Sequence, residues 1–157
     1  MDADELIAAL ELEPHPEGGW FRETWRDRPA DGSRGAGTAI YFLLRKGEQS
    51  RWHRVDAAEI WHFHDGAPLL LEYESESESE SESESESESE SESGQPMTAA
   101  VLGTGIDRGE RPQIVVPKGA WQRARSLGEW TLVGCTVSPA FQFDGFELAP
   151  PDADLPG

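Results

Sequence analysis

The sequence predicts an all-β domain of the sandwich or barrel type that begins with a short helix. From residue 38 onward, short runs of β-branched and aromatic residues alternate with turns marked by Gly, Asp and Pro, a spacing typical of sandwiches and barrels. Before them, residues 3–12 place Leu6, Ile7 and Leu10 on one helical stripe, and Asp2 or Asp4 can cap its start. The length of 157 residues suits one domain with a substantial core and is too short for two ordinary domains.

The elements follow one another in a regular series. A turn at residues 15–19 ends the helix, and His15 is interpreted as a turn residue rather than a ligand. Residues 28–37 are rich in Pro, Asp and Gly and are expected to form a loop. The expected strands are, in order, residues 20–25, 38–44, 50–55, 59–64, 69–73, 97–102, 113–116, 120–125, 130–137 and 141–148.

Residues 74–93 are an uninterrupted alternation of Glu and Ser. Such a composition cannot bury enough apolar surface to offset the entropy lost on ordering, so we predict a disordered insertion in a hairpin. The domain is therefore expected to span residues 1–149, with residues 150–157 as a flexible tail. A tolerated repeat expansion is the simplest interpretation of the tract, and phosphorylation of its serines or diffuse cation binding is the alternative.

The charge of the chain excludes some functions. Its net charge is −18, and ten of these negative charges come from the Glu-Ser tract, which leaves a moderately acidic remainder. This balance argues against nucleic acid as a partner. The acidic N-terminus has no basic region followed by an apolar run, so neither a signal peptide nor a membrane span is expected. The single cysteine, Cys135, is expected to be a buried small residue, and its lack of a disulfide partner suits the cytoplasm.

Residues 50–66 carry the residues of a candidate site. Read as two strands joined by a turn, they place Arg51, His53 and Val55 on one face of the first strand, and Glu59, Trp61 and Phe63 on one face of the second. If the turn folds the strands together, an imidazole and a carboxylate converge. The same alternation puts His62 and His64 on the face opposite Glu59. The alternative is a satisfied His–Glu hydrogen bond in an ordinary hairpin.

Five segments carry a resemblance to a known family. Residues 15–26, 38–44, 50–66, 102–125 and 132–148 resemble, in order, a domain of unknown function in the cupin superfamily that is often labelled a predicted sugar epimerase. The resemblance implies a double-stranded β-helix, or jelly-roll barrel, that commonly forms homodimers. The ligand that it implies is a small carbohydrate-like molecule, with no role for nucleic acid or a membrane.

The metal-binding pattern of cupins is incomplete in this chain. The first cupin motif fits Gly47-x5-His53-x-Val55-x3-Glu59-x6-Gly66, with Val55 where the motif has a second histidine. The second motif fits Pro117-x-Gly119-x2-Gln122-x3-Ser126, with Gln122 in place of a histidine. One imidazole, one carboxylate and one amide hold a divalent metal weakly, so a metal with the ligands His53, Glu59 and Gln122 is kept as an alternative to a metal-free site.

The resemblance implies an epimerase or isomerase acting on keto sugars or nucleotide sugars without a metal. Such an enzyme removes a proton beside a carbonyl, stabilises the enolate and returns the proton. We expect His53 to be the general base and Glu59 to orient it, with Arg51 or Arg22 meeting the oxyanion or a phosphate. The acid is sought in Tyr41 or Tyr73. Further ligand contacts are expected from Glu17, Trp61, Phe63 and Gln122.

A non-catalytic protein that binds a sugar-like small molecule is the alternative function, because one fold serves many activities. In that case His53, Glu59 and Gln122 would only form hydrogen bonds to a polar ligand.

Overall fold

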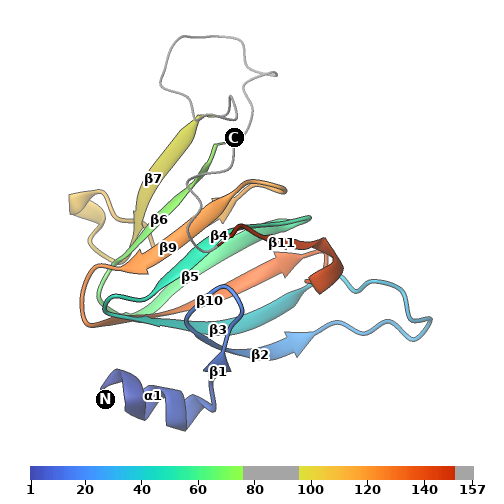
Figure 1. Ribbon diagram of the computed structural model, residues 1–157, viewed down its shortest axis with the longest axis horizontal. Helices are drawn as coiled ribbons and strands as arrows, with labels where there is room; N and C mark the ends of the chain where they lie inside the picture. Colours follow the sequence, from blue (N-terminus) through green and yellow to red (C-terminus); the bar gives the residue numbers. More distant parts are fainter. Residues whose placement is uncertain (76–95, 151–157) are drawn as a thin grey trace.

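A computed structural model describes residues 1–75 and 96–150 of the chain. Two antiparallel sheets make up the domain, and helix α1 (Ala3–Leu10) lies outside them at the N-terminus (Figure 1). The six-stranded sheet has the order β1 (Glu13–Pro14), β2 (Trp20–Arg26), β3 (Thr38–Arg45), β10 (Trp130–Ser138), β5 (Ala58–Gly66) and β8 (Gln113–Val116). The five-stranded sheet has the order β11 (Phe146–Leu148), β4 (Gln49–Val55), β9 (Gln122–Ser126), β6 (Leu69–Glu74) and β7 (Met97–Leu102).

The predicted N-terminal helix is confirmed, and its ends have clear causes. The side chain of Asp2 accepts from the amide of Glu5, and the Glu5 side chain accepts from the amide of Asp2, which completes a capping box. The helix ends because Glu11 adopts the left-handed conformation, with φ of 58°. Its apolar stripe packs on the outer face of β3 against the fully buried Leu43.

The core lies between the two sheets. Phe42 of β3 and Trp61 of β5 are fully buried and meet edge to face, with ring centroids 5.9 Å apart. Leucines of β6 and β7 close the same cluster from the opposite sheet. The inward side chains follow the period of two expected of strands with one buried face, and the predicted all-β architecture is confirmed.

Two predicted boundaries are wrong. The strand expected at residues 141–148 is reduced to β11, because residues 143–145 form a single 3₁₀ turn, η3. The amide of Phe141 donates to the side chain of Thr38 and not to a backbone carbonyl of a neighbouring strand. The insertion expected from residue 74 begins later, since Glu74 is the buried last residue of β6 and accepts from the amide of Trp121. A second 3₁₀ turn, η2 (Ile106–Arg108), follows β7.

Strands β6 and β7 are antiparallel neighbours, with Glu74 opposite Met97, so the Glu-Ser tract connects two paired strands. Residues 76–95 and 151–157 lie outside the described residues, and the predicted disorder of the tract and tail stays a prediction. Within the described part of the chain, no helix has the length and apolar character needed to cross a membrane.

Two β-bulges decide which side chains reach the interior. In β2 the register shifts between Glu23 and Trp25, so one extra residue is inserted opposite β3. In β4 the register shifts between Ser50 and His53 relative to β9. A bulge reverses the inward and outward alternation beyond it. Both shifts lie beside the cavity described next.

Candidate functional site

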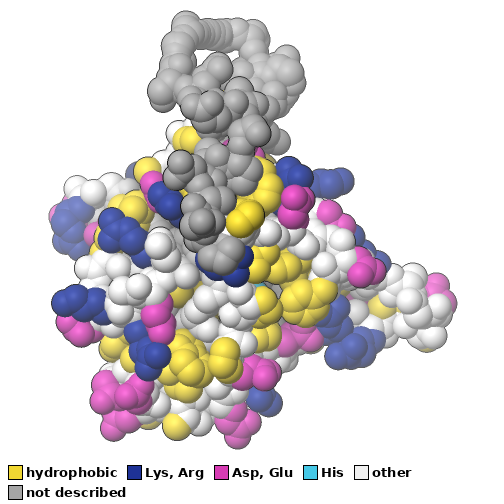
Figure 2. Space-filling model, in the orientation of Figure 1, with side chains coloured by type: hydrophobic (Ala, Val, Ile, Leu, Met, Phe, Trp, Pro, Cys, Tyr) yellow, Lys and Arg dark blue, Asp and Glu magenta, His cyan; other side chains and the backbone are white. Residues whose placement is uncertain are grey.

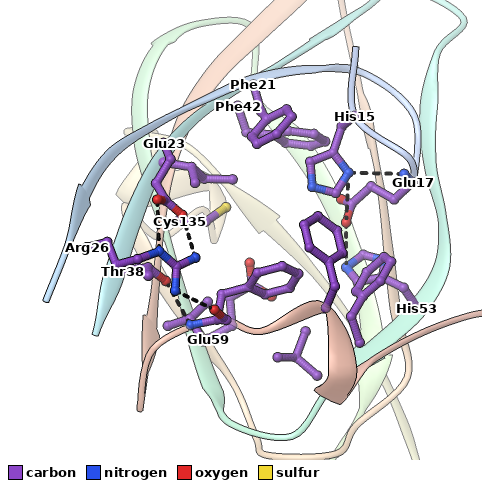
Figure 3. Close-up of a pocket in the computed structure, with 16 residues that line it drawn as sticks. His15, Glu17, Phe21, Glu23, Arg26, Thr38, Phe42, His53, Glu59 and Cys135 are labelled. Carbon is purple, nitrogen blue, oxygen red and sulfur yellow. Dashed lines mark hydrogen bonds and ion pairs between the residues drawn. The ribbon is translucent and has the colours of Figure 1, made fainter. Parts of the chain in front are cut away.

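A cavity of about 60 Å³ lies between the two sheets, beside η3 (Figure 3). Its apolar walls are Phe21, Ile40, Phe42, Val55, Val137, Phe141, Phe143 and Phe146. Its polar lining is His15, Glu17, Glu23, Arg26, Thr38, His53, Glu59 and Cys135. Four buried titratable side chains, those of His15, Glu17, His53 and Glu59, thus share an apolar cavity with the Cys135 thiol and the Glu23–Arg26 ion pair.

His53 reaches the cavity from β4. Its side chain is 1% exposed, and Nδ1 lies 2.7 Å from the carbonyl oxygen of Arg51. Because a carbonyl only accepts, Nδ1 carries the proton and Nε2 offers its lone pair to the cavity side. Burial lowers the pKa of His53 to about 4, so the imidazole is neutral near pH 7.

Glu17 is the partner of His53. Its Oε1 lies 3.3 Å from His53 Nε2. Burial, and then the charge of Glu59, raises the pKa of Glu17 well above its usual value and so favours its protonated form. The geometry agrees, because the unprotonated Nε2 of His53 faces the carboxyl oxygen. The contact is therefore a hydrogen bond in which the carboxylic acid donates to the imidazole, rather than an ion pair. The two residues hold one shared proton.

A tight turn delivers both Glu17 and His15. The amide of Glu17 donates to His15 Nδ1 over 3.0 Å, so His15 carries its proton on Nε2. The amide of Arg51 donates to the carbonyl of Glu17 over 2.7 Å and joins the turn to β4. Burial, followed by the nearby His53, lowers the pKa of His15 to about 4. His15 was interpreted as a turn residue only; it also lines the cavity.

Glu59 enters from β5, on the sheet opposite His53. Burial raises the pKa of Glu59 to about 7, although hydrogen bonds from Gln122 and the Cys135 thiol oppose the rise. Gln122 Nε2 donates to Glu59 Oε1 over 2.8 Å, and Gln122 Oε1 accepts from Trp61 Nε1 over 2.9 Å. The indole thus fixes the orientation of the amide, and the amide fixes the carboxylate.

We predict that Gln122→Met raises the pKa of Glu59 further. The amide donates to the carboxylate and favours its ionised form, so its removal leaves the carboxyl protonated to a higher pH. A hydrogen bond to a charged group contributes about 1.5–3 kcal/mol, which corresponds to a rise of about one to two pH units. The measurement is the ¹³C chemical shift of the Glu59 carboxyl group across pH. Gln113→Met, which removes an amide that contacts His62 on the outer face, is the control. An unchanged midpoint in Gln122→Met contradicts the prediction.

The structure separates the predicted site residues into three groups. His53, Glu59 and Glu17 line the cavity. Trp61, Phe63 and Gln122 face the interior but belong to the packing beneath it. His62 and His64 lie on the outer face as predicted: His62 Nε2 is 3.1 Å from Thr136 Oγ1, and the ring of His64 lies 6.3 Å from that of Tyr41.

Arg22 was predicted to reach the ligand, and its position corrects this. Arg22 is exposed and contacts Glu11 over 3.4 Å. Arg22 lies between Phe21 and Glu23, which both line the cavity, so regular alternation turns it outward. The bulge after Glu23 then brings Arg26 to the cavity as well. Arg26 donates twice to the Glu23 carboxylate, over 3.0 and 2.8 Å, and once to the carbonyl of Phe141 over 2.9 Å.

Arg51 and Tyr41 were also expected at the ligand, and they too lie outside the cavity lining. Because of the bulge in β4, the guanidinium of Arg51 donates to the carbonyl of Ala149. Tyr41 is on the outer face of β3, where it packs in the cluster beneath α1. Tyr73, the other candidate acid, pairs with Thr98 and Gln122 in the other sheet and is absent from the lining among the described residues.

The predicted metal ligands do not fit a metal. His53 Nε2 faces Glu17 rather than Glu59, and the Gln122 oxygen is occupied by the Trp61 indole. Across the described residues, no group of three or more His, Cys, Asp or Glu side chains is arranged to hold a metal ion. Gln122 is hydrogen-bonded to Glu59, whereas His53 contacts Glu17 and the Arg51 carbonyl, so the three residues do not form a ligand cage.

Comparison with known proteins gives concordant matches. A family model described as Cupin superfamily (DUF985) matches residues 4–149. A protein of known structure from Shewanella oneidensis is 41% identical, with a TM-score of 0.79 over 95% of this chain and 85% of that one. A hypothetical protein from Leishmania major is 30% identical, with a TM-score of 0.76 over 95% of this chain and 88% of that one.

More distant structures share the fold alone. An oxalate decarboxylase from Lactobacillus farciminis is 14% identical, with a TM-score of 0.57 over 87% of this chain and 33% of that one. No curated protein matches. The likeness confirms the jelly-roll barrel expected from the sequence.

Proposed function

The chain belongs to the family described as Cupin superfamily (DUF985). From the geometry of its cavity we propose that it is a proton-transferring isomerase or epimerase of small carbohydrate-like carbonyl compounds. One observation carries the proposal. Two proton-holding groups approach a single cavity from opposite sheets, Glu59 from β5 and the Glu17–His53 pair beside β4 (Figure 3). Near neutral pH one can accept a proton while the other can give one.

In the proposed reaction, the Glu59 carboxylate removes a proton from the carbon beside the substrate carbonyl. The C–H bond breaks, the proton passes to Glu59, and the electron pair moves into the carbonyl oxygen to form an enolate. For epimerisation, Glu17 then donates its proton to the opposite face of that carbon. For isomerisation, Glu17 protonates the former carbonyl carbon, while the hydroxyl proton of the first carbon passes to the enolate oxygen and the first carbon becomes the new carbonyl. The substrate loses one proton and gains one, and exchange with solvent restores the two carboxyl groups.

The neutral imidazoles support these steps. His53 Nε2 holds the Glu17 proton until transfer and accepts no substrate proton itself, so the base role expected for His53 passes to Glu59 in this proposal. The remaining N–H of His15 is a donor for the enolate oxygen, because its Nδ1 is occupied by the amide of Glu17. A neutral imidazole can act as such an electrophile when its pKa is lowered.

A non-catalytic binding protein is the second candidate, and one observation favours it. Among the described residues, the cavity lining contains no tyrosine, and its arginine is already engaged by Glu23 and Phe141. The lining therefore offers an enolate neither a tyrosine hydroxyl nor an unpaired arginine. This candidate predicts ligand-induced stabilisation without any proton exchange.

The test is incorporation of solvent deuterium into a panel of aldoses, ketoses and keto sugars, followed by NMR. We expect exchange beside the carbonyl, at a rate that falls by about 10²-fold in His53→Asn, the lower end for a group in acid–base catalysis because Glu17 remains. His62→Asn on the outer face is the matched control and keeps the wild-type rate. Stabilising ligands without exchange would overturn the isomerase and favour the binding protein.

Two further predictions are independent of the chemistry. Assembly as a homodimer rests on the family resemblance, and light scattering of the purified protein tests it.

A cytoplasmic location rests on the single, buried thiol of Cys135.

A further inference from the structure

The charges at the cavity restrict the ligand that it can hold. Three carboxyl groups line it, those of Glu17, Glu23 and Glu59, against one guanidinium, that of Arg26. Arg26 donates from Nε and Nη2 to the Glu23 carboxylate, and its Nη1 donates to the Phe141 carbonyl. A phosphate entering the cavity would therefore meet carboxyl groups and find no cation free to pair with it.

Two arginines near Phe146 are likewise paired with carboxylates. The hydrogen bonds from Arg34, and to a smaller extent the nearby charge of Lys118, lower the pKa of the Asp56 carboxyl group. Arg34 donates to both oxygens of Asp56, over 3.2 and 2.8 Å. Arg54 donates to Glu147, with 2.9 and 2.7 Å between the nitrogens and the carboxylate oxygen. A shallow groove on the other side of Phe146 is lined by the carboxylates of Asp56, Asp144 and Glu147, with Arg54 as its cation.

The wider surface adds no basic patch. On the face drawn in Figure 2, the Lys and Arg side chains of the described residues are scattered among Asp and Glu side chains and form no continuous basic area. The whole chain carries a net charge of −18, which repels polyanions at a distance. Proteins that bind phosphate use arginine, lysine or exposed backbone N–H groups directed at the oxygens.

The size of the hollow limits its occupant further. Its volume of about 60 Å³ corresponds to about four to six water positions, since one water needs about 10–15 Å³ on this measure. The walls include the edge-to-face cluster of Phe141, Phe143 and Phe146, and Phe143 is 59% exposed at the rim. A ligand of a few carbon and oxygen atoms fits inside, whereas a nucleotide would have to lie outside.

We infer that the ligand of this cavity is an uncharged, small polyhydroxy carbonyl compound, and that phosphorylated or nucleotide-linked sugars are rejected. That the ligand has a carbonyl group rests on the proposed function. That the ligand is uncharged rests on the paired charges around the cavity. It narrows the substrate expected from the sequence, which included nucleotide sugars. Hydroxyl groups of such a ligand can both donate to and accept from neutral carboxyl and imidazole groups, whereas a phosphate dianion only accepts.

The test uses two matched pairs of probes of the size that the cavity admits: glyceraldehyde with glyceraldehyde 3-phosphate, and dihydroxyacetone with dihydroxyacetone phosphate. Binding to the full chain is measured at pH 7 by saturation-transfer NMR and titration. We expect each neutral member to saturate the protein and its phosphate to bind at least about tenfold more weakly, because an unpaired buried anion is strongly disfavoured. A phosphate that binds as tightly as its neutral partner, or saturation by neither member, overturns the inference.

The variant Glu23→Gln is expected to gain affinity for phosphorylated ligands. It releases the Arg26 guanidinium from its ion pair, so the ratio of neutral to phosphorylated affinity should narrow by at least about tenfold. Glu147→Gln, which releases Arg54 outside the cavity, is the matched control and should leave the ratio unchanged. An unchanged ratio in Glu23→Gln counts against the inference.

Deuterium exchange run on the same probes separates this inference from the proposed function. If a phosphorylated probe binds well and exchanges deuterium, the inference of an uncharged ligand is wrong and the proposed isomerase activity is retained. Selective binding of neutral members without exchange would keep the neutral ligand and overturn the isomerase.

Discussion

Replacement of Glu59 by glutamine is expected to lower the rate of deuterium exchange by about 10³- to 10⁴-fold. The amide keeps the shape of the side chain and can still accept from Gln122 Nε2, but it cannot take a proton. In the wild-type protein the rate should rise with pH through about 7, the pKa to which burial raises Glu59. The measurement is the initial exchange rate between pH 5 and pH 9, and a variant rate within tenfold of wild type would contradict the assignment of Glu59 as the base.

The same variant should be more stable than the wild type, in a pH-dependent way. The folded-state pKa of Glu59 is raised to about 7 from 4.5, so between these values the folded state binds more protons than the unfolded state and stability falls as pH rises. Above pH 7 the full cost of about 3 kcal/mol is present, and below pH 4.5 it vanishes. The carboxyl of Glu17, the Cys135 thiol and neutral His53 share the cavity with Glu59 and carry no positive charge. The one cation of the lining, Arg26, is paired with Glu23.

Urea denaturation at pH 5 and pH 8 measures this effect. Glu59→Gln should add about 3 kcal/mol to the free energy of unfolding at pH 8 and less than about 1 kcal/mol at pH 5. His15 and His53 act in the opposite direction between about pH 4 and 6.5, because their lowered pKa values make stability rise with pH, but both proteins share that contribution. Exposed Glu129→Gln is the control, with small changes at both pH values. Equal gains at the two pH values would show that Glu59 is not the titrating group.

The second large effect is expected from Gly18→Ala. Gly18 has φ of 108°, and an added Cβ would lie 2.5 Å from the backbone carbonyl oxygen of Gln49. The contacted atom belongs to the backbone of β4 and cannot move away by a side-chain rotation. The turn that carries His15 and Glu17 must therefore shift. We expect a loss of about 2–4 kcal/mol in the free energy of unfolding, together with loss of exchange, since a strained left-handed residue alone costs about 1–3 kcal/mol.

Gly47→Ala separates backbone strain from the clash. Gly47 has a similar φ of 83°, but nothing lies within 4 Å of its added Cβ. Its substitution should cost about 1 kcal/mol and leave exchange unchanged. Urea denaturation and the exchange assay on both variants decide the matter. If the two substitutions lower the free energy of unfolding equally, the close packing of Gly18 against β4 is not what holds His15 and Glu17 in place.

Local patterns were sufficient for much of this protein. Alternation along residues 59–63 correctly placed Glu59, Trp61 and Phe63 on the inner face, and His62 on the outer face. The same alternation failed for Arg51 and could not place Arg26, because the first lies within a bulge and the second beyond one. Arg22 was assigned to the wrong face of a strand that alternates regularly up to Glu23. A bulge depends on the strand across the ladder, and nothing in the seven residues of β2 marks the extra one.

The sequence by itself determined the fold class, the capped helix, the family and the inward direction of His53 and Glu59. These follow from turn residues, capping residues and a period of two, all of which act between near neighbours in the chain. Only the tertiary structure decided that Glu17 is the partner of His53, that Gln122 supports Glu59, and that Arg26 is paired at the mouth. These contacts join residues from 36 to 115 positions apart or depend on bulges, and their protonation depends on burial, which no local pattern contains.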